Sequence, residues 1–128
     1  MKAAYFFTLI FLAGGLAYCG LEMLFRGRTH LSMFVVGGIC VQFLYVISVF
    51  SRVSVWKKWI ISGAMITTVE FIGGAIVNIL LGLDVWDYSH MRFNLMGQIS
   101  LQFSLLWVAL SAPVIWILGR FKKEVFAT

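Results

Sequence analysis

Residues 69–107 read VEFIGGAIVNILLGLDVWDYSHMRFNLMGQISLQFSLLW. The stretch begins with a carboxylate, Glu70, inside an apolar run that is long enough to cross a bilayer. It then passes through a polar patch at residues 86–89 before a second apolar run begins. A charged side chain at the centre of a bilayer costs roughly 2.5 to 3.5 kcal/mol on insertion scales. Glu70 therefore indicates a polar site inside a membrane protein.

The composition of the whole chain supports a membrane location. Of its 128 residues, 62% are hydrophobic and only 12% are charged, whereas a soluble domain carries about 25% charged residues. The chain has a single proline and no stretch rich in Ser, Pro and Gly that would serve as a linker. We therefore predict one transmembrane domain over residues 1–128.

Four apolar runs divide the chain, at about residues 3–25, 31–50, 58–83 and 96–119. A helix needs about 20 apolar residues to cross the hydrocarbon core, and each run meets or nearly meets that length. Apolar and polar residues do not alternate within the runs, so the runs indicate helices and exclude membrane strands. We predict an all-α fold, a polytopic membrane protein with a bundle of four transmembrane helices.

The basic residues predict the orientation of this bundle. Cytoplasmic loops carry an excess of Lys and Arg, and seven basic residues fall on the side of the N-terminus against three on the other side. Both termini are therefore predicted to be cytoplasmic. The seven are Lys2, Arg52, Lys57, Lys58, Arg120, Lys122 and Lys123, and the three are Arg26, Arg28 and Arg92.

Four tryptophans lie near the ends of the apolar runs, where interfacial anchors are found. They are Trp56, Trp59, Trp86 and Trp116. The anchor interpretation accounts for all four, although the polar residues that follow Trp86 are harder to explain as part of an interfacial belt.

Small and polar residues recur at helical spacing on three of the runs, and we predict that these faces meet. The third run carries Gly63, Thr67, Glu70, Gly74 and Asn78; the fourth carries Gly97, Ser100, Ser104 and Ser111, with Gln98 and Gln102 alongside; the first carries Gly15, Tyr18, Cys19 and Glu22. Close helix packing explains the glycines and serines, but packing does not require a carboxylate. Three explanations are open for Glu70: it lines a polar cavity, it belongs to a buried ion pair, or it is a neutral acid in a structural role.

The candidate polar cluster joins acids, amides, arginines and aromatic residues, and it serves either to bind a substrate or ion or to hold the structure together. Its members are Glu22, Arg26, Arg28, Glu70, Asn78, Trp86, Asp87, Tyr88 and Asn94. The arginines either pair with the acids or contact lipid headgroups.

The sequence lacks the patterns of enzymes and of cofactor sites. Asp87, Ser89 and His90 are close in sequence, but a catalytic triad is a geometry assembled in space. Two histidines, with Cys19 and Cys40 in separate apolar runs, give no metal-ligand spacing. No phosphate-binding loop is present, and the basic residues form no single stripe. We therefore expect no enzymatic activity, no metal or other cofactor, and no nucleic-acid binding.

A set of residues between Glu70 and Trp107 matches a family pattern: Glu70-Phe71, Gly74, the run at 86–89, Phe93, Asn94, Gly97, Ile99, Leu101 and Trp107. With these residues the sequence resembles the bacterial CmpB-like membrane proteins, a family named for type IV ABC-transporter permeases, and is similar to small animal multi-pass transmembrane proteins. Glu22 is similar to an acidic position in the first half of the family. The Gly-Pro and Pro-Ile-Tyr-Gly elements of many bacterial members are replaced here by Ser32-Met33-Phe34 and Gly37-Gly38. The resemblance implies transport and a place in the bacterial cytoplasmic membrane.

Two functions are expected from these features. The first is an integral membrane transporter or channel component with a polar intramembrane site centred on Glu70, and it predicts that water reaches Glu70. Because four helices make a narrow bundle, this function predicts a homodimer or a partner membrane subunit, and ATP-driven transport would add a separate nucleotide-binding subunit. The alternative is a non-transporting protein that binds lipid or holds a partner membrane protein, with residues 86–89 as a lid or headgroup contact.

Overall fold

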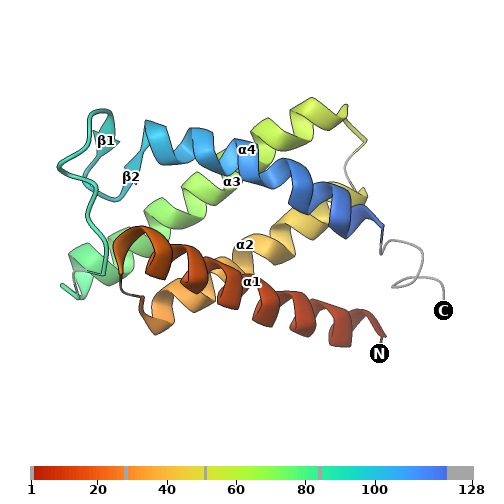
Figure 1. Cartoon of the computed structure of the whole chain (residues 1–128), viewed down its shortest axis with the longest axis horizontal. Coiled ribbons are helices and arrows are strands. Elements are labelled where there is room, and N and C mark those ends of the chain that lie inside the picture. The colour runs from red at the N-terminus through yellow and green to blue at the C-terminus, as the bar shows by residue number, and fades with distance from the viewer. Residues whose placement is uncertain (1, 28, 51, 84, 121–128) are drawn as a thin grey trace.

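The computed structural model describes residues 2–27, 29–50, 52–83 and 85–120. Four long helices follow one another in alternating directions (Figure 1). They are α1 (Lys2–Arg26), α2 (Leu31–Phe50), α3 (Val55–Gly74), which continues as the π-helix η1 (Ala75–Leu80), and α4 (Leu101–Gly119). All four are long and apolar enough to cross a membrane. The predicted all-helical fold with four membrane-spanning helices is confirmed.

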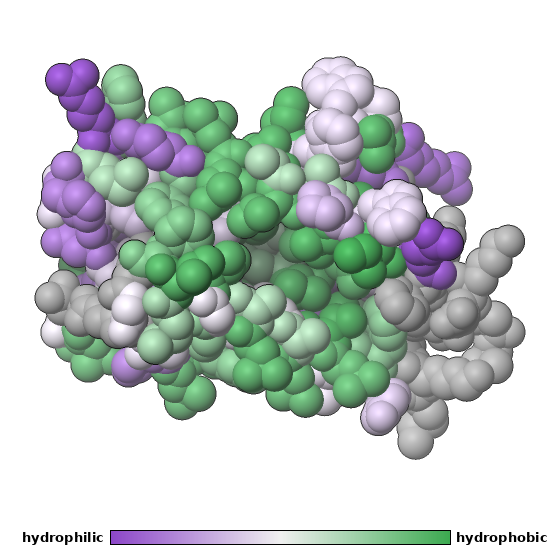
Figure 2. Space-filling model, viewed as in Figure 1, coloured by the Kyte–Doolittle hydropathy of each residue, from purple (hydrophilic) through white to green (hydrophobic). Residues whose placement is uncertain are grey.

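The bundle is built from two helix pairs. α1 packs along α2, α3 packs along α4, and α2 also contacts both helices of the second pair. Glycines set the short distance between α1 and α2, since a Cβ atom at Gly37 would lie 2.7 Å from the carbonyl oxygen of Gly14. Figure 2 shows apolar side chains over the middle of the visible face and polar side chains gathered near its two ends, as expected for a surface that faces lipid.

The third and fourth helices differ from the predicted ranges. α3 begins at Val55, three residues earlier than predicted, and the helix ends at Leu80. α4 begins at Leu101 and not near residue 96, because residues 94–100 form a short hairpin. In this hairpin β1 (Asn94–Leu95) pairs antiparallel with β2 (Ile99–Ser100). The Ser100 side chain then caps α4 by accepting a 3.2 Å hydrogen bond from the Phe103 N–H.

The π-helix η1 carries the end of α3 toward the next loop. Its wide turn is closed by a 2.9 Å hydrogen bond from the Leu81 N–H to the Ile76 carbonyl. The start of α1 and the end of α4 lie at one end of the bundle (Figure 1). The connection between α1 and α2 and the loop at residues 81–100 lie at the other end, and we call the latter the 81–100 loop.

Candidate functional site

Glu70 is at the centre of a buried group of hydrogen bonds. Its Oε2 atom accepts hydrogen bonds from the hydroxyls of Tyr18, at 2.9 Å, and Tyr88, at 3.0 Å. Its Oε1 atom accepts one from the indole Nε1–H of Trp107, at 3.1 Å. Only 1% of Glu70 is exposed, and such burial is tolerated because the carboxylate is hydrogen-bonded. We call Tyr18, Glu70, Tyr88 and Trp107 the Glu70 cluster.

The three donors come from three separate segments, and packing fixes each of them. Tyr18 lies on α1, with its Cβ atom over the bare backbone of Gly37 on α2. Trp107 lies on α4, with its ring centroid 5.5 Å from that of Tyr18. Tyr88 belongs to the 81–100 loop and stacks on Phe103 of α4 at 4.9 Å. One carboxylate on α3 therefore joins α1, α4 and the loop.

A second set of hydrogen bonds holds the 81–100 loop against the end of α3. The Asn78 Oδ1 atom accepts hydrogen bonds from the backbone N–H groups of Val85, at 2.6 Å, and Trp86, at 3.3 Å. Its Nδ2 atom donates to Gln98 Oε1 at 2.8 Å. The Trp86 indole N–H donates to the Gln98 carbonyl at 3.0 Å. We call Asn78, Trp86 and Gln98 the loop clasp.

Gly74 leaves room for the loop clasp. A Cβ atom there would clash with Gln98 Oε1 and would lie 3.1 Å from the Trp86 ring. Gly74 is one turn from both Glu70 and Asn78 along the same helix face. The face of α3 that carries small and polar residues is therefore the face that receives the loop.

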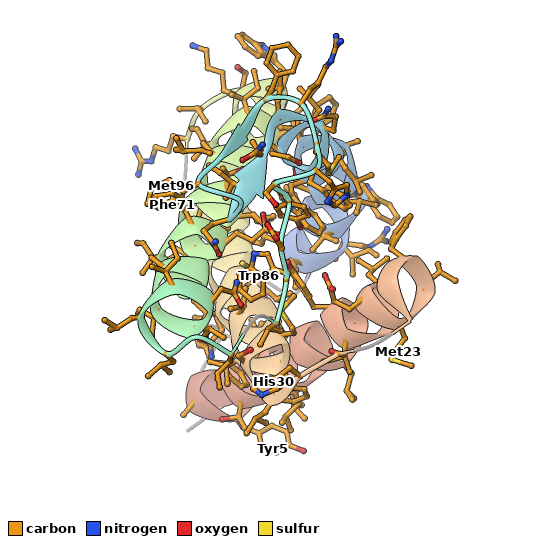
Figure 3. The ribbon with its side chains drawn as sticks, turned by 90° about the vertical axis from the view of Figure 1, so that its left-hand side faces the viewer. Tyr5, Met23, His30, Phe71, Trp86 and Met96 are labelled. Carbon is orange, nitrogen blue, oxygen red and sulfur yellow. The ribbon has the colours of Figure 1, made fainter. Side chains whose placement is uncertain are left out.

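The prediction that Trp86 is an interfacial anchor is wrong. Trp86 is only 1% exposed and lies between the loop and the helices (Figure 3). Its indole N–H bonds inward to Gln98, so the ring fills the bundle and does not face headgroups. Trp56 and Trp116 are 54% and 65% exposed, with Lys57 over the Trp56 ring and Arg120 over the Trp116 ring.

The remaining polar residues of the loop shape its backbone. Asp87 is exposed, and its Oδ1 atom accepts a 2.8 Å hydrogen bond from the Ser89 N–H, which lowers the pKa of the Asp87 carboxyl below its usual value. Asn94 accepts a 3.0 Å hydrogen bond from the Gly97 N–H and donates one of 2.7 Å to the Met91 carbonyl. Ser89 and His90 are exposed, like Asp87.

The predicted group of acids and arginines is described only in part. Glu22 is buried on α1, one turn beyond Tyr18. The side chain of Arg26 and all of Arg28 and Asp84 lie outside the described residues. Arg92 is exposed. Among the residues that the structure describes, no group of three His, Cys, Asp or Glu side chains could hold a metal ion.

The structure thus brings Glu70 and Tyr88 together, places Asn78 two turns further along the helix with Trp86 bonded to it, and leaves Asp87 on the surface. The predicted cluster omitted Tyr18, Gln98 and Trp107, although these residues take part in four of the seven hydrogen bonds described for the Glu70 cluster and the loop clasp. A signal for Tyr18 and Trp107 was present, because a buried carboxylate needs donors and a tyrosine hydroxyl or a tryptophan indole can supply one within an apolar helix.

The polar faces of α3 and α4 also meet further along the bundle. The Thr67 and Ser104 hydroxyls are 2.7 Å apart, and Gly63 lies directly against Val108. Close packing with hydrogen bonds between small polar side chains is typical of helices in membranes. Glu70 therefore lies at one end of a continuous contact between α3 and α4.

A family model described as "Putative ABC-transporter type IV" matches residues 5–128. The chain belongs to this family. The resemblance to the CmpB-like proteins is thereby confirmed, and it covers nearly the whole chain. Together with the four apolar helices, family membership makes this a multi-pass membrane protein related to ABC transporters. Searches of the curated proteins and of the solved structures gave no match.

Proposed function

We propose that the chain is a membrane-spanning subunit of a transporter and that the Glu70 cluster is its gate. One observation carries this proposal: a single buried carboxylate accepts hydrogen bonds from α1, from the 81–100 loop and from α4. A side chain with that position can release three segments in one step. A site that only fixed the fold would not need one ionisable group to hold all three.

The conformation described here is the closed state of this gate. The transport hypothesis predicted that water reaches Glu70, but the side chain is only 1% exposed and is bonded to Tyr88, which is itself buried. Water access would therefore require the 81–100 loop to move. Protonation of Glu70 would turn one acceptor oxygen into a donor, and a cation would compete with the tyrosine and tryptophan donors. Either event weakens the hydrogen bonds that hold the loop.

The proposal includes the orientation and the partners of the subunit. Both termini are placed in the cytoplasm by the distribution of basic residues, and α1 begins at the end of the bundle where α4 stops, as this orientation requires. Family membership supports a membrane subunit that works with other subunits. A second copy of the chain or another membrane subunit would complete the path, and a separate subunit would bind the nucleotide. The membrane would be the bacterial cytoplasmic membrane.

Proton flux through the purified chain tests the gate. Proteoliposomes containing a pH-sensitive dye and a potassium gradient receive valinomycin, and the rate of internal acidification is compared with that of protein-free liposomes. We expect the wild type to acidify faster, and Glu70→Gln to fall to the rate of protein-free liposomes.

The matched control for this experiment is Thr68→Val. Thr68 lies two residues before Glu70 on the same helix, is exposed, and bonds only to the Ala64 carbonyl among its described contacts. Its replacement should leave the flux unchanged. Equal flux in wild type and Glu70→Gln, or a wild type no faster than empty liposomes, would contradict the proton-sensitive gate.

A crevice between α2 and α3 favours a second function, that of a non-transporting protein that binds lipid. It has a volume of about 500 Å³ and is lined by apolar residues such as Val36, Ile39 and Ile72. Gly73 lies in its wall, where an added Cβ atom would come within 3.3 Å of Val36. Under this function Gly73→Leu should remove a lipid that co-purifies with the wild type in native mass spectrometry. Ala64→Leu, an exposed change elsewhere on α3, should not.

A further inference from the structure

A groove between α1 and α4 lies directly behind the Glu70 cluster. Its volume is about 110 Å³, its walls come from all four helices, and they are almost entirely apolar. Ala17 lines the groove and is exposed at its mouth. The groove exists because α1 packs on α2 and makes few contacts with α3 and α4 among the described residues. Its lining residues all lie within the four membrane-spanning helices, and none belongs to the 81–100 loop.

Two aromatic side chains connect the groove to Glu70. Tyr18 and Trp107 both line the groove, and both direct their polar atoms to the Glu70 carboxylate. The surface that they leave to the groove is therefore ring carbon. Their ring planes are inclined by 31° with centroids 5.5 Å apart, so the two rings pack against each other in the wall of the groove.

This wall fits a positive charge carried on an apolar molecule. The faces of tyrosine and tryptophan rings attract cations, and the attraction is stronger when water is excluded. The carboxylate behind the rings adds to the attraction, and the low dielectric constant of the surroundings strengthens it. The lining contains no Lys, Arg or His side chain that would repel a cation.

The volume of the groove sets the size of the group that it can hold. A cavity of roughly 150 Å³ lined by aliphatic side chains is large enough for benzene, which has six heavy atoms. A trimethylammonium group has only four heavy atoms, its nitrogen and three methyl carbons. The groove can therefore hold such a head, while the open side leaves an attached alkyl chain in the lipid.

We propose that the groove between α1 and α4 binds a hydrophobic cation that enters sideways from the membrane. The cationic group lies against the rings of Tyr18 and Trp107, and the alkyl chain leaves past Ala17. This proposal rests on the proposed transport function and names its substrate class. It also assigns Tyr18 and Trp107 two roles, since the same side chains contact the substrate and hold Glu70.

Photocrosslinking in lipid nanodiscs tests the proposal without any transport step. The probe is an alkyl chain with a terminal trimethylammonium group and a diazirine beside it. The matched probe carries a tert-butyl group in its place, which has the same shape without the charge. Labelled residues are mapped by mass spectrometry. We expect the charged probe to label the groove residues of α1 and α4 about tenfold more than the neutral probe.

Two pairs of variants locate the site. Ala17→Phe fills the mouth of the groove and should remove the labelling, whereas Ala13→Phe, one turn away on the exposed side of α1 and outside the groove, should not. Trp107→Phe keeps an aromatic wall and should retain part of the preference for charge, while Glu70→Gln should reduce that preference.

Equal labelling of the groove by both probes would overturn the assignment of a cation, and labelling spread evenly over all lipid-facing residues would overturn the groove itself. Labelling of the groove that persists in Ala17→Phe would also overturn the groove as the binding site. A failed gate shows itself differently, as a proton flux that Glu70→Gln does not change, so the two proposals can fail independently.

Discussion

The Tyr18 hydroxyl donates a 2.9 Å hydrogen bond to the Glu70 carboxylate, although 52 residues separate them in the chain. α1 has few other contacts with α3 among the described residues, so this bond is a main link between the first helix and the rest of the cluster. It ties the helix pair α1–α2 to the pair α3–α4.

Replacement of Glu70 by leucine should destabilise the protein strongly. The change leaves the Tyr18, Tyr88 and Trp107 donors without their acceptor, and each buried unsatisfied group costs about 1–3 kcal/mol. We expect a loss of several kcal/mol in the free energy of unfolding, measured by denaturant titration in detergent micelles. Glu70→Gln keeps an acceptor oxygen and should lose less. An unchanged stability of Glu70→Leu would mean that the cluster contributes nothing to the fold.

Replacement of Asn78 by alanine should loosen the 81–100 loop. Asn78 accepts hydrogen bonds from the Val85 and Trp86 N–H groups, and its replacement removes both bonds. We expect faster hydrogen exchange at residues 85–88 and a loss of about 1–3 kcal/mol. Gln102→Ala, which changes an exposed amide on α4, is the control. Equal exchange in both variants would show that another contact holds the loop.

Two glycines should respond in opposite directions to substitution by alanine. At Gly74 a methyl group would meet Gln98 and Trp86, so the variant must shift the loop clasp and should be less stable. At Gly20 nothing lies within 4 Å, and alanine there should stabilise α1 by roughly 0.5–1 kcal/mol through its helix propensity. Thermal unfolding of the two purified variants compares them directly, and the same sign of change in both would contradict the packing described here.

The turn at Asp87 should depend on pH in a defined direction. The Ser89 N–H bond lowers the pKa of Asp87 in the folded protein. The turn is therefore favoured above the ordinary carboxyl pKa, about 3.9. This stabilisation is lost as the pH falls through the lower pKa of the folded protein. Exchange of the Ser89 amide should therefore become faster, relative to neighbouring amides, only in strong acid. Asp87→Asn should remove this dependence, and its persistence in that variant would point to another group.

Reporter fusions should place both ends of the chain in the cytoplasm. A fluorescent protein fused after residue 128 is expected to be bright, and alkaline phosphatase inserted in the 81–100 loop is expected to be active. The opposite pattern would reverse the bundle in the membrane. It would also place the 81–100 loop on the side of the nucleotide.

The sequence allowed the four helices to be predicted because each is an unbroken apolar run of sufficient length. It did not reveal that Trp86 turns inward. An interfacial anchor and a buried tryptophan can both lie at the end of an apolar run, and both have an amphipathic indole. The later start of α4, at Leu101, was also missed. The hairpin of residues 94–100 depends on left-handed backbone at Phe93 and Met96, where the residue types give little signal.

Glu70 could be singled out from the sequence alone, since an ionisable side chain within an apolar run that spans a bilayer is costly without partners. Its donors could not be assigned in the same way. Helical spacing placed Tyr18 on a face predicted to meet that of Glu70, but it did not identify the bonded atom, and Trp107 was not included in the predicted face of the fourth run. The helical spacing of Gly74 and Asn78 with Glu70 did indicate one face of α3.

The π-helix at residues 75–80 gives the third span one residue more than an α-helix of the same height would hold. A relative that lacks one residue there would regain regular α-helical geometry, and a different side chain would then face the backbone of Val85. The number of residues between Glu70 and Trp86 therefore determines which side chain of the third span faces the loop. It tells whether another member of the family can close its loop over the acid in the same way.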